Sequence, residues 1–218
     1  MFARLLATLS CVLPVGVCLA RAEAVASPDR QVDVYLATNS NQPIPPIQEM
    51  KREVAALLKT AGYRVSWHVP GAGSTENPLV VVELRGSCQA PWPDTTVEPV
   101  TSGTSLASTA VSNGQVQPFT WLECDTLIRL LAPAWHGQPP LQRDQLFGRA
   151  MGRLLAHELL HYLTHTEGHD TDGIGKPSFS AKEVLAEHFD FAEASLERFR
   201  NFSAEDAEEM PSDVGAGR

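Results

Sequence analysis

The sequence predicts an α+β domain with a mixed, twisted sheet of about four strands, a backing helix, a central helix and a C-terminal helix. Two observations predict this class. Short strand-like segments and one helical segment fill the first half of the chain, and the longest helical segments follow the last strand. The order strand, helix, strand at the start also predicts a parallel β-α-β unit.

The first 22 residues have the three parts of a secretory signal peptide. Arg4 supplies a positive charge, an apolar run follows from Leu5 to Leu19, and the small residues Ala20 and Ala22 mark a cleavage site. The run is too short for a membrane span, and no later stretch approaches the roughly 18 apolar residues that a span requires. We therefore expect an exported protein, periplasmic or secreted, that is not stably inserted in a membrane after residues 1–22 are removed.

The remaining chain is acidic. Its net charge of −9 becomes −11 when Arg4 and Arg21 leave with the signal peptide, because that segment contains no acidic residue. Such a chain is a poor partner for nucleic acid or anionic membranes. Residues 23–200 are enough for one domain with a sizeable core, and the polar, acidic residues 201–218 predict a disordered tail.

The first two strands are predicted at residues 31–37 and 63–69, where β-branched and polar residues alternate. Between them, Pro45-Pro46 opens the backing helix and Ala61-Gly62 closes it with a glycine C-cap. Residues 78–84 form a third strand that is apolar enough to be central.

Residues 87–117 are rich in Pro, Ser, Thr and Gly and predict a long connection, with an edge strand or hairpin near residues 96–108. Residues 118–124 then predict a last strand that leads into a short helix at residues 125–131. Prolines and a glycine break the chain before the central helix, which is expected to begin near Gln142.

The C-terminal helix is predicted to start at Ser180, which can form a capping box with Glu183. Its apolar side chains are expected to hold it against the body of the domain. These are Val184, Leu185, Phe189, Phe191 and Leu196.

Two cysteines remain in the mature chain, Cys88 and Cys124. In an exported protein a lone pair is more often a disulfide than two free thiols. The spacing is not the Cys-x-x-Cys of many zinc sites. We predict a disulfide that ties the third strand to the segment preceding the central helix.

The central helix carries the residues from which function can be argued. Its apolar residues cover more than one helical stripe, so the helix is expected to be buried: Leu146, Phe147, Ala150, Met151, Leu154, Leu155, Leu159, Leu160 and Leu163. His157 and His161 are four residues apart, so their imidazoles leave one face close enough to bind one ion. Glu158 projects about 100° away round the helix, so it reaches the outer ligand of the metal rather than the metal itself.

This His-Glu-x-x-His pattern is typical of zinc hydrolases, in which the carboxylate takes a proton from a zinc-activated water. The alternative is a chance match of core or surface residues. Against it, two histidines and a glutamate are costly to bury in an apolar helix without a partner. The pattern therefore predicts one Zn²⁺ ion, with Glu158 as the catalytic base.

A longer segment agrees with a known family. It reads Ala-His-Glu-x-x-His-Tyr-Leu at residues 156–163, then places His169 eight residues after the second histidine, then Gly-Ile-x-Lys at residues 173–176. This segment resembles that of small exported bacterial zinc metalloproteases of the metzincin type, over roughly residues 148–180. The resemblance implies a minimal metzincin-like domain over residues 23–200 and a peptide or protein substrate. The sequence has Gly175 where that family has a methionine.

Four residues are candidates for a third ligand. His165 lies about 12 Å along a regular helix from His157, too far for one ion. Glu167 stands where the third metzincin histidine is usual, and Glu183 has the spacing of a ligand glutamate on a following helix, although the capping box would occupy it. His169 follows Gly168, which can turn the chain back, and it matches the resembling segment. We expect His157, His161 and His169 as ligands, with Asp170 or Asp172 beside them.

Three functions fit these residues. The first is an exported zinc metalloendopeptidase with Glu158 as general base. The second is a zinc hydrolase of a non-peptide substrate, since the motif specifies activated water and not an amide bond. The third is a non-catalytic zinc-binding module in which Glu167 or His165 closes the site, although such a site has no use for a base at Glu158.

Overall fold

The computed structural model describes residues 30–37, 42–69, 77–90, 104–135 and 137–202. The predicted signal peptide and the predicted tail beyond Phe202 lie outside these residues. The last described helix ends at Asn201, one residue past the domain boundary expected at residue 200. None of the described helices is long and apolar enough to span a membrane.

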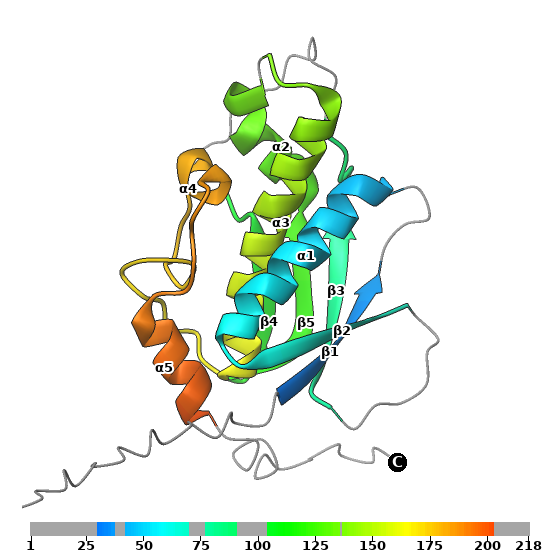
Figure 1. The fold of residues 1–218 in the computed structure, drawn as a ribbon. Helices are drawn as coiled ribbons and strands as arrows, with labels where there is room; N and C mark the ends of the chain where they lie inside the picture. The colour runs from blue at the N-terminus through cyan, green and yellow to red at the C-terminus, as the bar shows by residue number, and fades with distance from the viewer. Residues whose placement is uncertain (1–29, 38–41, 70–76, 91–103, 136, 203–218) are drawn as a thin grey trace, which may run out of the picture.

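The architecture is α+β with a mixed five-stranded sheet in the order β2-β1-β3-β5-β4 (Figure 1). The strands are β1 (Arg30–Ala37), β2 (Tyr63–His68), β3 (Leu79–Arg85), β4 (Ala107–Ser112) and β5 (Gln115–Glu123). Strand β1 pairs in parallel with β2 and β3, and β3 pairs in parallel with β5, which confirms the parallel unit and the central place of β3. Only β4 is antiparallel to its neighbour.

The sheet has one strand more than the four or so expected. The additional strand is β4, which begins at the end of the region, near residues 96–108, where an edge strand or hairpin was expected. The Asn113-Gly114 pair explains its position, because both residues have positive φ, 53° and 74°, as a two-residue type I′ hairpin turn requires. Residues 96–103 are outside the described ranges. The pairing slips between Thr109 and Val111, opposite a stretch of β5 that contains Pro118, which has no N–H to donate.

Helices α1 (Ile44–Thr60) and α3 (Pro140–Leu163) lie side by side on one face of the sheet (Figure 1). Their backbones approach closely because α3 has glycines at the contact. A Cβ atom at Gly148 would lie 2.4 Å from the carbonyl oxygen of Pro46, and one at Gly152 would lie 2.6 Å from Cβ of Glu53. This contact fixes α3 in the centre of the domain, where nearly every residue of its second half is buried.

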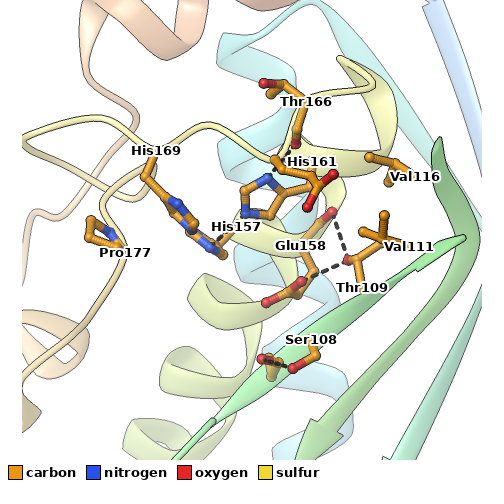
Figure 2. Close-up of a pocket in the computed structure, with 12 residues that line it drawn as sticks. Ser108, Thr109, Val111, Val116, His157, Glu158, His161, Thr166, His169 and Pro177 are labelled. Atoms are coloured by element: carbon orange, nitrogen blue, oxygen red, sulfur yellow. Dashed lines mark hydrogen bonds between the residues drawn. The ribbon is translucent and has the colours of Figure 1, made fainter. Parts of the chain in front are cut away.

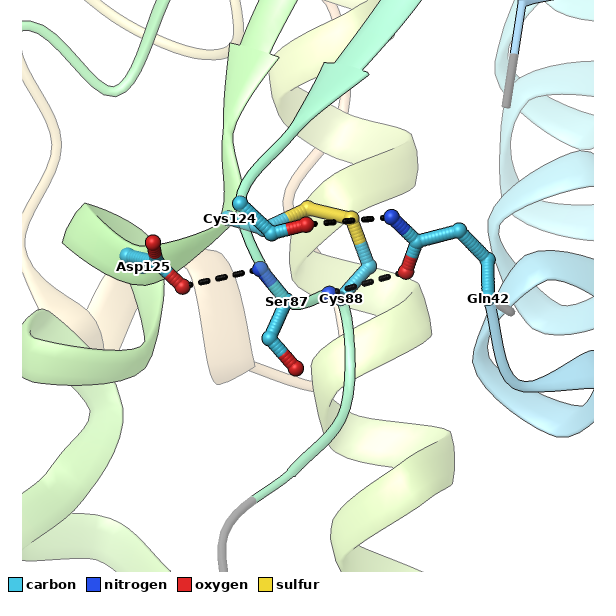
Figure 3. The surroundings of a disulfide bond; sticks show 6 residues. Gln42, Ser87, Cys88, Cys124 and Asp125 are labelled. Carbon is cyan, nitrogen blue, oxygen red and sulfur yellow. Dashed lines mark hydrogen bonds between the residues drawn. A yellow bond between two sulfur atoms is a disulfide. The ribbon is translucent and has the colours of Figure 1, made fainter. Parts of the chain in front are cut away.

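The disulfide between Cys88 and Cys124 is present, as predicted, with a Cα–Cα distance of 5.0 Å (Figure 3). It joins the chain just after β3 to the first residue of α2 (Cys124–Leu131), which continues into a 3₁₀ helix, η1 (Ala132–Trp135). Gln42, two residues before α1, holds the main chain beside the disulfide. Its side chain donates to the Gly86 carbonyl and accepts from the Cys88 N–H, both at 3.0 Å. Both cysteines are fully buried.

The single C-terminal helix predicted from Ser180 is wrong. The structure has two helices, α4 (Ala181–Leu185) and α5 (Glu193–Asn201), and the chain turns to an extended conformation at Ala186. The buried guanidinium of Arg153, on α3, donates to the carbonyl oxygens of Val184 and Ala186 at 3.1 and 2.7 Å. It thereby binds carbonyls that a longer helix would use internally, and an ion pair with Glu53 at 2.7 Å fixes it in place.

Candidate metal centre

The second half of α3 brings three polar side chains to one cavity. His157, Glu158 and His161 are 5%, 5% and 8% exposed, among neighbours on the helix that are mostly buried and apolar. The cavity has a volume of about 250 Å³ and opens between α3, strand β4 and the chain that follows α3 (Figure 2). The residues that the sequence singled out therefore share one solvent-accessible space.

Main-chain carbonyls orient the two helical imidazoles. Nδ1 of His157 donates to the carbonyl oxygen of Ile174 at 2.6 Å, and Nδ1 of His161 donates to that of Thr166 at 2.7 Å. Because a carbonyl oxygen only accepts, both Nδ1 atoms carry the proton and both Nε2 atoms present lone pairs. These Nε2 atoms lie 3.0 Å apart. Two lone pairs at this distance repel each other, and a cation bound to both removes the repulsion.

His169 completes the group. Its ring centroid lies 5.3 Å from that of His157 and 4.8 Å from that of His161. One ligand atom from each of the three histidines falls within 4.8 Å of the others, close enough to bind a metal ion. Among the described residues, this is the one cluster of three or more potential ligands.

The chain that carries His169 is tied to α5. The carboxylate of Asp170 accepts a hydrogen bond from Ser195 and forms an ion pair with Arg198. Arg198 also donates to the Gly168 carbonyl at 3.0 Å. Carbonyls, and not the carboxylates of Asp170 or Asp172, accept from the two helical histidines, and Asp172 instead bonds the N–H of Gly173.

Gly175 stands where the resembling segment has methionine, and the structure gives the reason for glycine. A Cβ atom there would lie 2.3 Å from Oδ2 of Asp170 and 2.5 Å from Oγ of Ser195. The hydrogen bond between these two side chains thus occupies the space beside Gly175. The neighbouring Ile174 is fully buried, and its N–H donates to the Asp190 carbonyl at 3.0 Å.

The other candidate ligands lie elsewhere. Glu167 is exposed at the rim of the cavity, outside the three-histidine group. Glu183 forms the predicted capping box with Ser180 and also pairs with Lys176, whose hydrogen bond is the main cause lowering the pKa of Glu183 to about 2. His165 stacks on Phe202 at a centroid distance of 4.8 Å.

Burial sets the protonation of the site. It lowers the pKa of His157 to about 4, so at neutral pH this imidazole is uncharged and can donate its lone pair. It raises the pKa of Glu158 to about 7, although a hydrogen bond from Thr109 opposes that rise. The carboxyl group therefore exchanges a proton near neutral pH, as a general acid-base group must.

Sequence reasoning missed the wall of the cavity opposite the loop. It is formed by residues of β4, including Ser108 and Thr109, and the Thr109 hydroxyl contacts Glu158 (Figure 2). This segment is rich in serine and threonine and far from the histidines in sequence, so it gave no signal that one of its hydroxyls would reach Glu158. Arg153 was missed for a similar reason, since nothing local marks its partners around α4.

Comparison of the sequence with models of known protein families finds no match, and comparison with curated protein sequences finds no relative.

Proposed function

We propose that this protein is an exported zinc-dependent metallopeptidase in which His157, His161 and His169 hold one zinc ion and Glu158 is the general base. The observation that carries the proposal is the placement of a buried carboxylate in the same cavity as a three-histidine cluster. A structural metal site would have no need of that carboxylate. A closed site is further disfavoured because Glu167 and His165 lie outside the cluster.

The donor set suits zinc. Three neutral imidazoles with an open fourth position are a common arrangement in catalytic zinc sites, and second hydrogen bonds to carbonyls commonly fix such ligands. When bound, a zinc ion would supply Lewis-acid chemistry, which polarises a carbonyl group and lowers the pKa of water. His157 and His161 have the required tautomer, with Nδ1 protonated and Nε2 free.

Glu158 would move the proton. Its carboxylate takes a proton from the attacking water and later passes it to the leaving amine, so that one group serves as base and then as acid.

Strand β4 favours a peptide over other substrates. The N–H of Glu123 donates to the Leu106 carbonyl at 2.9 Å, which makes these residues a hydrogen-bonded pair. By the alternation of antiparallel ladders, the main-chain groups of Ala107 and Thr109 face the outer edge of the sheet, where the Ala107 carbonyl already accepts the hydroxyls of Ser105 and Ser108 at 2.6 and 2.7 Å. An extended peptide can pair with such an edge and would then lie along the cavity.

Export is supported by the predicted signal peptide and by the disulfide. Cys88 and Cys124 form a buried bond of the kind that persists in oxidising compartments.

The test is a metal analysis of the purified mature protein together with hydrolysis of an unstructured protein substrate. We expect about one zinc per chain, and we expect Glu158→Gln to keep the zinc while losing about a hundredfold or more in rate, because the amide accepts no proton. Glu167→Gln, at the rim of the same cavity, is the matched control and should retain activity.

Zinc without turnover would favour a non-catalytic module. Turnover of small esters but not of peptides would favour the non-peptide hydrolase. A Glu158→Gln rate within about tenfold of the parent would exclude the role given to Glu158.

A further inference from the structure

One hydroxyl reaches the Glu158 carboxylate from outside α3. Oγ1 of Thr109, on β4, lies 2.7 Å from Oε2 of Glu158 and 3.3 Å from the main-chain oxygen of the same residue (Figure 2). Within the described parts of the chain, no other side chain forms a hydrogen bond with this carboxylate. Thr109 thus reaches across the cavity from the strand to the helix.

A second threonine orients that hydroxyl. Oγ1 of Thr120, the cross-strand partner on β5, lies 3.0 Å from Oγ1 of Thr109. Thr109 has a single hydroxyl proton, and a carboxylate can only accept it, so Thr109 donates to Glu158 and accepts from Thr120. Thr120 is 1% exposed, and water therefore does not compete for its hydroxyl.

We propose that Thr109, oriented by Thr120, is a positioning residue that holds the carboxylate of Glu158 in one orientation toward the three-histidine cluster. The proposal rests on the proposed function, in which Glu158 is the base. The helix fixes only the Cα atom of Glu158, and its side chain has three further torsions. A carboxylate that rotated among several positions would lie within reach of the attacking water for only part of the time.

The orientation of Thr109 also predicts which kinetic constant is affected. Its main chain faces the outer edge, where an extended substrate would pair, whereas its hydroxyl points inward to Glu158. Loss of the hydroxyl therefore leaves the peptide-binding groups in place. The effect should fall on kcat and not on KM.

The experiment compares Thr109→Val, which removes the hydroxyl and keeps the shape, with Thr109→Ser, which keeps the hydroxyl. We expect Thr109→Val to lower kcat by about tenfold to a hundredfold with KM within about twofold, and Thr109→Ser to stay within about threefold of the parent. Ser112→Ala is the matched control, because Ser112 is an exposed residue of the same strand and is not among the residues that line the cavity. It should leave kcat within about twofold.

A second readout does not depend on activity. In crystal structures of the zinc-loaded proteins, the Glu158 carboxylate should have one orientation in the parent and in Thr109→Ser, and displaced or multiple orientations in Thr109→Val. If the parent hydrolyses no substrate, the proposed function fails, and these structures still decide the positioning role. Should Thr109→Val not fold, Thr120→Val removes the orienting partner and is expected to disorder the carboxylate in the same way.

An unchanged carboxylate in the variant that folds would overturn the proposal. So would an undiminished kcat in an active Thr109→Val, or an equal loss of kcat in Thr109→Ser or Ser112→Ala.

Discussion

The two parts of the three-histidine cluster are built differently. His157 and His161 are held by the regular hydrogen bonds of α3, a 24-residue helix packed on both the sheet and α1. His169 lies on a chain without regular structure, between the end of α3 and α4. It is held by the contacts of Asp170 and Arg198 and not by a repeating pattern.

The difference shows how local and distant interactions divide the work of forming the site. On α3, the spacing of four residues brings two imidazoles to one face, and the carbonyls of Ile174 and Thr166 orient their rings. On the loop, the position of His169 depends on partners 25 to 30 residues away in sequence. The helical part should therefore tolerate changes in α5, and the loop should not.

Removing a ligand from either part gives the largest expected effect. His161→Ala should weaken zinc binding by about a thousandfold or more, roughly 4 kcal/mol, because it takes one of two pre-arranged nitrogens from the helix. His169→Ala should weaken it too, but less, because the helical pair remains. Competition with a chromogenic chelator measures both affinities. Full affinity in His169→Ala, with loss in Glu167→Ala or Glu183→Ala, would show that the third ligand is misassigned.

The disulfide should affect stability without affecting the metal. Replacing Cys88 and Cys124 by alanine should lower the free energy of unfolding by about 4 kcal/mol for a 36-residue separation, on the chain-entropy account. Zinc affinity should be unchanged, since the bond lies outside the three-histidine cluster. Urea titration and chelator competition measure the two quantities. Two reactive thiols in the denatured, unreduced parent would refute the bond itself.

Placing a methionine at position 175, as in the resembling segment, should disturb the loop that carries His169. In Gly175→Met, the new Cβ would meet the carboxylate of Asp170 and the hydroxyl of Ser195. We expect a loss of about tenfold to a hundredfold in zinc affinity, as is usual when groups that support ligands are displaced. Ser178→Met, at an exposed position of the same segment, is the control. Equal affinity in both variants would mean that the tether to α5 does not position His169.

The smallest expected effect is on the stability of the fold at acidic pH. The hydrogen bond from Lys176 and those from Ser180 lower the folded-state pKa of Glu183 to about 2 from an ordinary value of 4.5. The carboxylate therefore stabilises the fold above pH 4.5, and this contribution is lost as pH falls from 4.5 toward 2. Unfolding of the metal-free protein between pH 5 and 3 should show a shallower pH dependence in Glu183→Gln than in the parent or in Glu197→Gln, a change at an exposed site. If the free energy of unfolding depends on pH identically in the three proteins, Glu183 does not make this contribution.

The sequence could predict the features that depend on neighbouring residues, and not those that depend on residues distant in the chain. Local patterns predicted the positions of β1 and β2, the proline and glycine limits of α1, and the shared face of His157 and His161, and the structure has all of them. The disulfide was predictable because only two cysteines remain after the signal peptide.

The rest depended on distant partners. The division of the last helix follows from Arg153, about 30 residues earlier in the chain. The glycine at position 175 is explained only by the Asp170–Ser195 contact. The hydroxyl of Thr109 meets Glu158 across 49 residues of sequence. No periodicity or motif records such pairs, because each is set by the packing of separate elements.

The bond between Cys88 and Cys124 also closes a covalent ring, and strands β4 and β5 both lie within it. A peptidase is exposed to cleavage by its own kind, and a cut inside this ring breaks the chain without separating the fragments. Both walls of the cavity then remain parts of one molecule. On a denaturing gel, the nicked protein would give a single band without reductant and two bands with it. In the peptidase proposed here, the disulfide would therefore keep both walls of the cavity joined after such a cut.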